Sequence, residues 1–91
     1  GGMPPLMASI RHRRGSAVWE PLLRRSTRIN ARDRSGWAAL HYAAEYSEDP
    51  ELFKALLARG ASRELRDRRD RTPAEIAAEH GRDKIAALLQ P

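Results

Sequence analysis

Residues 30–61, NARDRSGWAALHYAAEYSEDPELFKALLARGA, decide the fold, because residues 64–90, ELRDRRDRTPAEIAAEHGRDKIAALLQ, repeat their pattern. Arg32-Asp33 aligns with Arg66-Asp67 at a spacing of 34 residues, and an Ala-Ala pair follows ten residues later in both units. A repeat of this length is typical of proteins built from stacked units, each of which buries its apolar face against its neighbours.

Each unit contains the signals for two short helices. In the second unit Thr72-Pro73-Ala74-Glu75 forms a capping box with proline at the first helical position, and Gly81 ends that helix. The stretch 82–90 then has apolar residues at i, i+3 and i+4, which predicts a second helix. In the first unit we expect one helix over 38–46 and another that begins after Asp49 and ends at glycine 60.

This pattern resembles the ankyrin repeat, a unit of about 33 residues with a TPLHxAA core. The residues that carry the resemblance in the first unit are Gly36, Leu40-His41, Ala43-Ala44, Leu56-Leu57 and Gly60-Ala61. In the second unit they are Asp67, Thr72-Pro73, Ile76-Ala77-Ala78, Gly81, Ile85 and Leu88-Leu89. The resemblance implies an all-α solenoid of stacked helix-turn-helix units with turn or hairpin tips. It also implies that His41 forms hydrogen bonds between the turns of neighbouring repeats, and Tyr42 aligns with a core position.

The expected organisation is one small ankyrin-repeat domain over residues 16–91. We divide it into a half repeat at 16–32, a repeat at 33–66 and a repeat at 67–91. Residues 1–15 are expected to be a tag remnant, Gly1-Gly2, followed by a basic flexible arm with little periodicity.

Composition excludes several classes of protein. The chain has 91 residues, enough for one small domain, and no Cys, which excludes disulfides and thiolate metal sites. No apolar run approaches the roughly 20 residues of a membrane span. The net charge of +5 arises in residues 1–32, where seven Arg face Glu20 alone, whereas the rest of the chain is nearly neutral.

The sequence gives little support to an enzyme. Its three histidines lie far apart, and none has the spacing of metal ligands. The acids between residues 45 and 51 surround a predicted helix start, where negative charge is favourable. Neither a Ser-His-Asp arrangement nor a phosphate-binding glycine loop is present. We therefore expect no catalytic residues, no metal and no cofactor.

The resemblance implies that partner proteins bind to the turn tips and to the exposed side of the first helix of each repeat. Carried over by position, the predicted partner-binding residues are Arg34, Ser35, Trp37, Tyr46, Arg59, Arg68, Arg69, Arg71 and His80. Trp, Tyr and Arg are the residue types enriched at binding hot spots. Arginine also forms paired hydrogen bonds to carboxylate and phosphate groups.

The predicted function is a protein–protein interaction module or adaptor whose partner presents an acidic or phosphorylated segment. Trp37 and Tyr46 would be the apolar anchors of that contact. A structural alternative for Trp37 is that it packs against the turn at Arg71 and covers an end of the core. Self-association through exposed repeat faces is a further possibility.

The alternative function is a basic, nucleic-acid-associated accessory protein that uses residues 10–32 as its contact surface. Arginines without interleaved aromatic residues would give weak, salt-sensitive binding without sequence readout. Two stretches in this region, Arg13-Arg14-Gly15-Ser16 and Arg24-Arg25-Ser26, also resemble sites of arginine-directed kinases.

The composition favours an intracellular location, in the cytoplasm or alternatively the nucleus.

Overall fold

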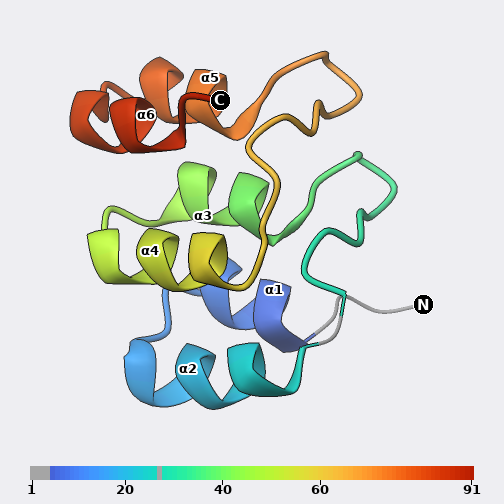
Figure 1. Ribbon diagram of the computed structural model, residues 1–91, viewed down its shortest axis with the longest axis vertical. Coiled ribbons are helices and arrows are strands. Elements are labelled where there is room, and N and C mark those ends of the chain that lie inside the picture. Colours follow the sequence, from blue (N-terminus) through green and yellow to red (C-terminus); the bar gives the residue numbers. More distant parts are fainter. Residues whose placement is uncertain (1–4, 27) are drawn as a thin grey trace.

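Three pairs of helices stack on one another along the chain, and two long loops project from one side of the stack (Figure 1). The computed structural model describes residues 5–26 and 28–91. Gly1-Gly2, the expected tag remnant, lies outside the described residues. The helices are α1 (Pro5–Arg11), α2 (Ser16–Arg25), α3 (Ala39–Tyr46), α4 (Pro50–Ala58), α5 (Pro73–Glu79) and α6 (Asp83–Leu89), and the described part of the chain contains no strand.

The first helices of the three pairs form one row, in which α1 packs on α3 and α3 packs on α5. The second helices, α2, α4 and α6, form the other row (Figure 1). Leu40, Phe53, Leu56, Ile76 and Leu89 are almost completely buried between the rows. The core is therefore a thin layer of mostly aliphatic side chains, and the two tips stand outside it, where they are held by polar contacts.

Local sequence explains where the helices begin. The hydroxyl of Thr72 accepts from the backbone N–H of Glu75, and the Glu75 carboxylate accepts from the Thr72 N–H, so the predicted capping box is present. The carboxylate of Asp49 accepts from the N–H of Glu51 and caps α4, also as expected. Ala38 precedes α3 and has no side-chain oxygen that could accept a backbone N–H of the helix. The other half of the cap is present, because the ring of His41 accepts the N–H of Ala38.

The N-terminal segment differs from the expected flexible arm. Residues 5–11 form α1, and Leu6, Met7 and Ile10 are buried as α1 packs against α3. Pro5 suits the first position of a helix, and the i, i+4 spacing places Leu6 and Ile10 on one face. The first repeat is therefore a full pair of helices, and the half repeat expected at 16–32 contains its second helix and the start of the loop that leads to the first tip.

Candidate functional site

Two aspartates at equivalent positions build the two tips in the same way. One oxygen of Asp33 accepts from the backbone N–H groups of Ser35 and Trp37, at 2.9 and 3.0 Å. One oxygen of Asp67 accepts from the N–H groups of Arg69 and Arg71, both at 2.9 Å. These bonds close each turn around its own carboxylate, so the tips have a defined shape before any ligand is present.

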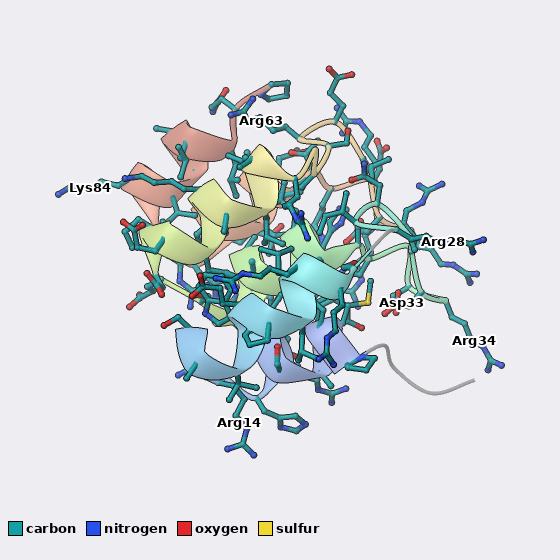
Figure 2. The ribbon with its side chains drawn as sticks, turned by 60° about the horizontal axis from the view of Figure 1, so that its bottom comes forward. Arg14, Arg28, Asp33, Arg34, Arg63 and Lys84 are labelled. Carbon is teal, nitrogen blue, oxygen red and sulfur yellow. The ribbon has the colours of Figure 1, made fainter. Side chains whose placement is uncertain are left out.

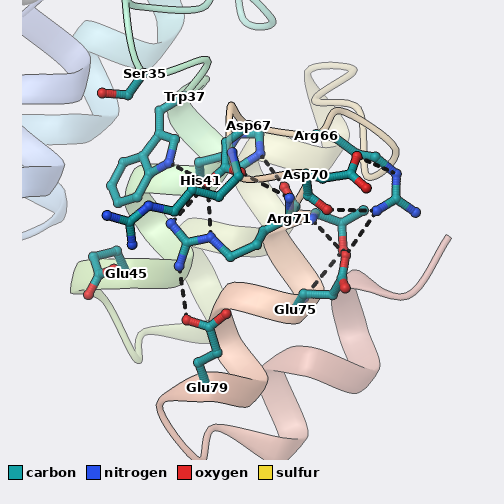
Figure 3. Close-up of polar contacts among 12 residues, drawn as sticks. Ser35, Trp37, His41, Glu45, Arg66, Asp67, Asp70, Arg71, Glu75 and Glu79 are labelled. Atoms are coloured by element: carbon teal, nitrogen blue, oxygen red, sulfur yellow. Dashed lines mark hydrogen bonds and ion pairs between the residues drawn. The ribbon is translucent and has the colours of Figure 1, made fainter.

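The second oxygen of each aspartate makes a different contact. The Tyr42 hydroxyl donates to Asp33, within the same repeat. Asp67 instead accepts from the Trp37 indole N–H at 2.9 Å, and so joins two repeats. It also accepts from the guanidinium of Arg71, whose other end donates to Glu79 at 2.9 Å (Figure 3).

These contacts shift the ionisation of the groups involved. Burial alone would raise the pKa of Asp67, but the hydrogen bonds from Arg71, Trp37 and Arg69 lower its pKa to about 2. Burial raises the pKa of Tyr42 to about 12, and the neighbouring Asp33 carboxylate adds to the shift. Asp67 is thus a fixed negative charge inside the second tip, and its side chain is only 1% exposed.

His41 links the two tips as the resemblance implied. Its Nδ1 accepts the N–H of Ala38 at 3.1 Å, and its Nε2 lies 3.3 Å from the carbonyl oxygen of Arg71 in the next repeat. Burial lowers the pKa of His41, so the neutral ring with a proton on Nε2 fits both contacts. His41 has a structural role, and the buried ring is not available to a ligand.

The tips, α3 and Arg11 at the end of α1 border an open hollow of about 540 Å³, which we call the tip hollow. Three aromatic rings lie along its wall: Trp37 contacts Tyr42 edge to face at 5.0 Å, and Tyr42 stacks on Tyr46 at 6.3 Å. Tyr42 itself is buried, as expected. The lining residues are Arg11, Arg34, Ser35, Trp37, Tyr42, Glu45, Tyr46, Asp67, Arg68, Arg69 and Arg71.

The structure brings most of the predicted partner-binding residues into this hollow. Arg34, Ser35, Trp37, Tyr46, Arg68, Arg69 and Arg71 line it. Arg59 and His80 do not: the Arg59 guanidinium donates to the Leu23 carbonyl at 2.7 Å, and His80 pairs with Glu45. The partner-binding role expected for Arg59 and His80 therefore has no counterpart in the lining of this hollow.

The arginines of the tip hollow fall into two groups. Arg34, Arg68 and Arg69 are exposed, and within residues 5–26 and 28–91 none of them forms an ion pair. The Arg71 side chain is 18% exposed and is held between Asp67 and Glu79. Three guanidinium groups are therefore available to an anion, whereas Arg71 shapes the wall.

Trp37 has a structural contact of its own. Its ring is half-buried, its N–H is bonded to Asp67, and it lies nearly parallel to the His41 ring. These contacts agree with the structural alternative, in which Trp37 packs against the neighbouring turn. The exposed part of the Trp37 ring still lines the tip hollow. Sequence reasoning missed Arg11 as a lining residue, because it treated residues 3–15 as a flexible arm.

The basic residues of the N-terminal half do not form one surface. Arg14 lies at one end of the molecule, far in the view from Arg28 and Arg34 beside the tips (Figure 2). Arg13 and Arg14 line a separate hollow, whose lining also includes Trp19, Glu48 and Asp49. The described residues contain no cluster of His, Asp or Glu able to hold a metal ion. Within residues 5–26 and 28–91, none of the helices is long and apolar enough to cross a membrane.

Comparison with known proteins agrees with this geometry. Residues 6–91 match the family described as ankyrin repeats (3 copies). The chain is 35% identical over 75 residues to calmodulin-binding transcription activator 4 of Arabidopsis thaliana, which covers 76% of the chain and 7% of that protein. It is 40% identical over 57 residues to the fowlpox virus (strain NVSL) protein FPV233, itself named for ankyrin repeats, which covers 63% of the chain and 11% of the relative. The chain thus spans about a tenth or less of these relatives, and it belongs to the ankyrin-repeat family.

Proposed function

We propose that this chain is a protein–protein interaction module that holds an acidic or phosphorylated segment of a partner in the tip hollow. Ankyrin repeats are generally protein-interaction modules and typically not enzymes. We further propose that the two tips and the exposed face of α3 contact the partner segment, and that the chain does not catalyse a reaction on it. The observation that supports it is the convergence of seven predicted binding side chains on one hollow.

The charges of the hollow favour an acidic ligand. Arg34, Arg68 and Arg69 are exposed at its rim, whereas the negative charge of Asp67 is already paired with Arg71. Guanidinium groups form charge-assisted, bidentate hydrogen bonds with carboxylates and phosphates. A segment with several acids would therefore find donors on both tips at once.

The aromatic wall supplies the apolar part of the contact. Tyr46 is half-exposed and stacks on Tyr42, and Trp37 is fixed by its bond to Asp67. Rings that are already held lose little conformational freedom when a ligand packs against them, which reduces the entropy lost on binding. An apolar side chain of the partner would lie against Tyr46 and Trp37, between the acidic residues that contact the rim.

Nucleic acid fits this surface less well. A phosphate backbone needs a continuous series of cations, and its affinity increases with the number neutralised. Arg14 lies far from Arg28 and Arg34 in the view of Figure 2. Glu45 also lines the hollow itself and would repel a phosphate. A DNA probe tested beside the acidic peptide therefore decides between the two kinds of partner.

The test compares two double variants with the same change in charge. Arg68→Gln/Arg69→Gln removes two rim cations, and Arg28→Gln/Arg63→Gln removes two exposed arginines outside the hollow. The probes are a fluorescein-labelled peptide of sequence Glu-Asp-Leu-Glu-Asp-Leu-Glu and a fluorescein-labelled DNA duplex. Fluorescence polarisation gives the affinity of each chain for each probe, at low and at physiological salt.

We expect the rim variant to bind the peptide about tenfold or more weakly, since one tenfold step corresponds to about 1.4 kcal/mol and two charge-assisted contacts are lost. The control variant should change the affinity by less than about twofold, the effect of long-range charge alone at physiological salt. Equal loss in both variants would refute the assignment to the tip hollow. DNA bound by all chains more tightly than the peptide would favour the nucleic-acid function.

A further inference from the structure

Ser35 lines the tip hollow at the point where the first tip contacts the second. Its N–H donates to Asp33, and its carbonyl accepts from the N–H of Arg68 at 3.1 Å, so its backbone is fixed on both sides. The residue is exposed, and its hydroxyl forms no hydrogen bond within the described part of the chain. The hydroxyl is therefore free to react, at a point that directly adjoins the second tip.

The surroundings of this hydroxyl are basic. Arg34 precedes it in the sequence, the backbone of Arg68 is bonded to it, and Arg69 lines the same hollow. Arg32, three residues before Ser35, donates across to the carbonyl of Arg66 at 3.4 Å. Arginine at the third and first positions before an exposed serine is a context that arginine-directed protein kinases accept.

We propose that Ser35 is a phosphorylation site, and that its phosphate closes the tip hollow to acidic segments. In the transfer, the Ser35 hydroxyl oxygen bonds to the γ-phosphorus of ATP and the bond from that phosphorus to the β–γ bridging oxygen breaks. ADP leaves, and the hydroxyl proton passes to a base of the kinase. The regulation of acidic binding rests on the proposed function, whereas the site itself and its phosphate–arginine contact do not.

The effect follows from charge. A phosphoserine carries about −1.5 to −2 charges at pH 7 and three acceptor oxygens, and an adjacent arginine cluster can form one to three charge-assisted hydrogen bonds with it. Because this phosphate is tethered, it competes with any free acidic segment at a high effective concentration. It would pair with Arg68 and Arg69 and leave fewer donors at the rim.

The test uses chains that carry phosphoserine in place of Ser35 or, as a control, in place of Ser16. Ser16 is also exposed and follows two arginines, but it lines a different hollow with Glu20 and Lys54. A ³¹P NMR titration reports the second pKa of each phosphate, which lies at about 6 when the phosphate is free. We expect a lower pKa at position 35, and its return towards the free value when Arg68→Gln/Arg69→Gln is added.

Two further measurements complete the test. The acidic peptide probe should bind the chain phosphorylated at position 35 about tenfold more weakly, and the Ser16 control within about twofold of the unmodified chain. Incubation of the unmodified chain with ATP and an arginine-directed kinase, followed by tandem mass spectrometry, should place a phosphate on Ser35.

The outcomes separate the two proposals. The phosphorylation site is overturned if the second pKa of the phosphate at position 35 equals that of a free phosphate. It is also overturned if the kinase transfers phosphate to Ser16 but never to Ser35. An unmodified chain that does not bind the peptide overturns the proposed function, while the titration still decides the phosphate–arginine contact. Unchanged peptide affinity with a lowered phosphate pKa refutes the closing of the hollow.

Discussion

Replacement of Asp67 by Asn should destabilise the protein and remove part of its sensitivity to acid. The asparagine side chain would keep one carbonyl oxygen for the backbone N–H groups of Arg69 and Arg71, but its amide group would face two donors, the Trp37 indole and the Arg71 guanidinium. The contact between the second and third repeats would therefore lose its acceptor and its charge.

The magnitude follows from the pKa of Asp67. Its ordinary value is 3.8, and the hydrogen bonds lower the pKa to about 2 in the folded chain. At 1.36 kcal/mol per pKa unit, this shift corresponds to about 2.5 kcal/mol of stability at pH 7. Asp67→Asn should thus lower the free energy of unfolding by about 3 kcal/mol, the lower end for breaking a buried ion pair. In a domain of this size the Tm would fall by roughly 12 to 24 °C.

The pH dependence has a defined sign. The pKa of Asp67 is lower in the folded chain than in the unfolded chain. Its contribution to the free energy of unfolding is therefore complete above about pH 4 and is lost as the pH falls towards 2. The wild-type chain should lose about 1 kcal/mol from this group by pH 3, and the variant should lack this part of the slope. Urea unfolding followed by circular dichroism, at about pH 7, 4 and 3, measures both effects.

Asp33→Asn is the matched control, because Asp33 makes the same two backbone bonds in the first tip. Its third partner is the Tyr42 hydroxyl, which can turn and accept from an amide group. The loss there should be about 1 kcal/mol. Equal losses at the two positions, or an unchanged acid slope in Asp67→Asn, would refute the reasoning that the charge of Asp67 holds the repeats together.

Three other substitutions test the tips and turns. Gly36→Ala should cost about 1 kcal/mol more than Gly60→Ala in urea unfolding, because both glycines have positive φ but a Cβ only at Gly36 would lie 3.1 Å from backbone atoms of the next tip. Equal costs would exclude the close approach. Arg13→Gly should raise stability by about 0.5 kcal/mol, since Arg13 has a φ of 56° at the end of α1; a lower Tm would contradict this. Glu45→Gln should tighten the acidic peptide about threefold by polarisation, as it removes a like charge from the hollow; weaker binding would show that its pair with His80 matters more.

The repeat could be predicted from sequence because its signals are local. The capping box at Thr72, the Asp49-Pro50 helix start and the glycines after the helices depend only on neighbouring residues, and the structure has each of them. The 34-residue spacing then places equivalent residues above one another. For this reason Arg34 and Arg68, one spacing apart, line the same hollow.

The remaining features depend on contacts between repeats. α1 was missed because the segment has only a short apolar face, which contains Leu6 and Ile10. A helix of this length is stable only when that face is buried, here against α3. Arg71 and Arg59 have the residue type of a binding site, yet each is paired with a group 8 or 36 residues away. Residue type and position predict that a side chain lies near a surface, but not which neighbour holds it.

The arginine contacts between repeats have a consequence for synthesis. Arg59 donates to the carbonyl of Leu23, 36 residues earlier, and Arg82 donates to the carbonyl of Ala44, 38 residues earlier. The carbonyl groups at these two helix ends therefore receive their arginine donor only after most of another repeat has been translated. On the ribosome the contact of the first pair of helices with Arg59 would form after that residue emerges, and the contact of the second pair with Arg82 later still, so that each repeat would gain its last polar contact from the repeat that follows it.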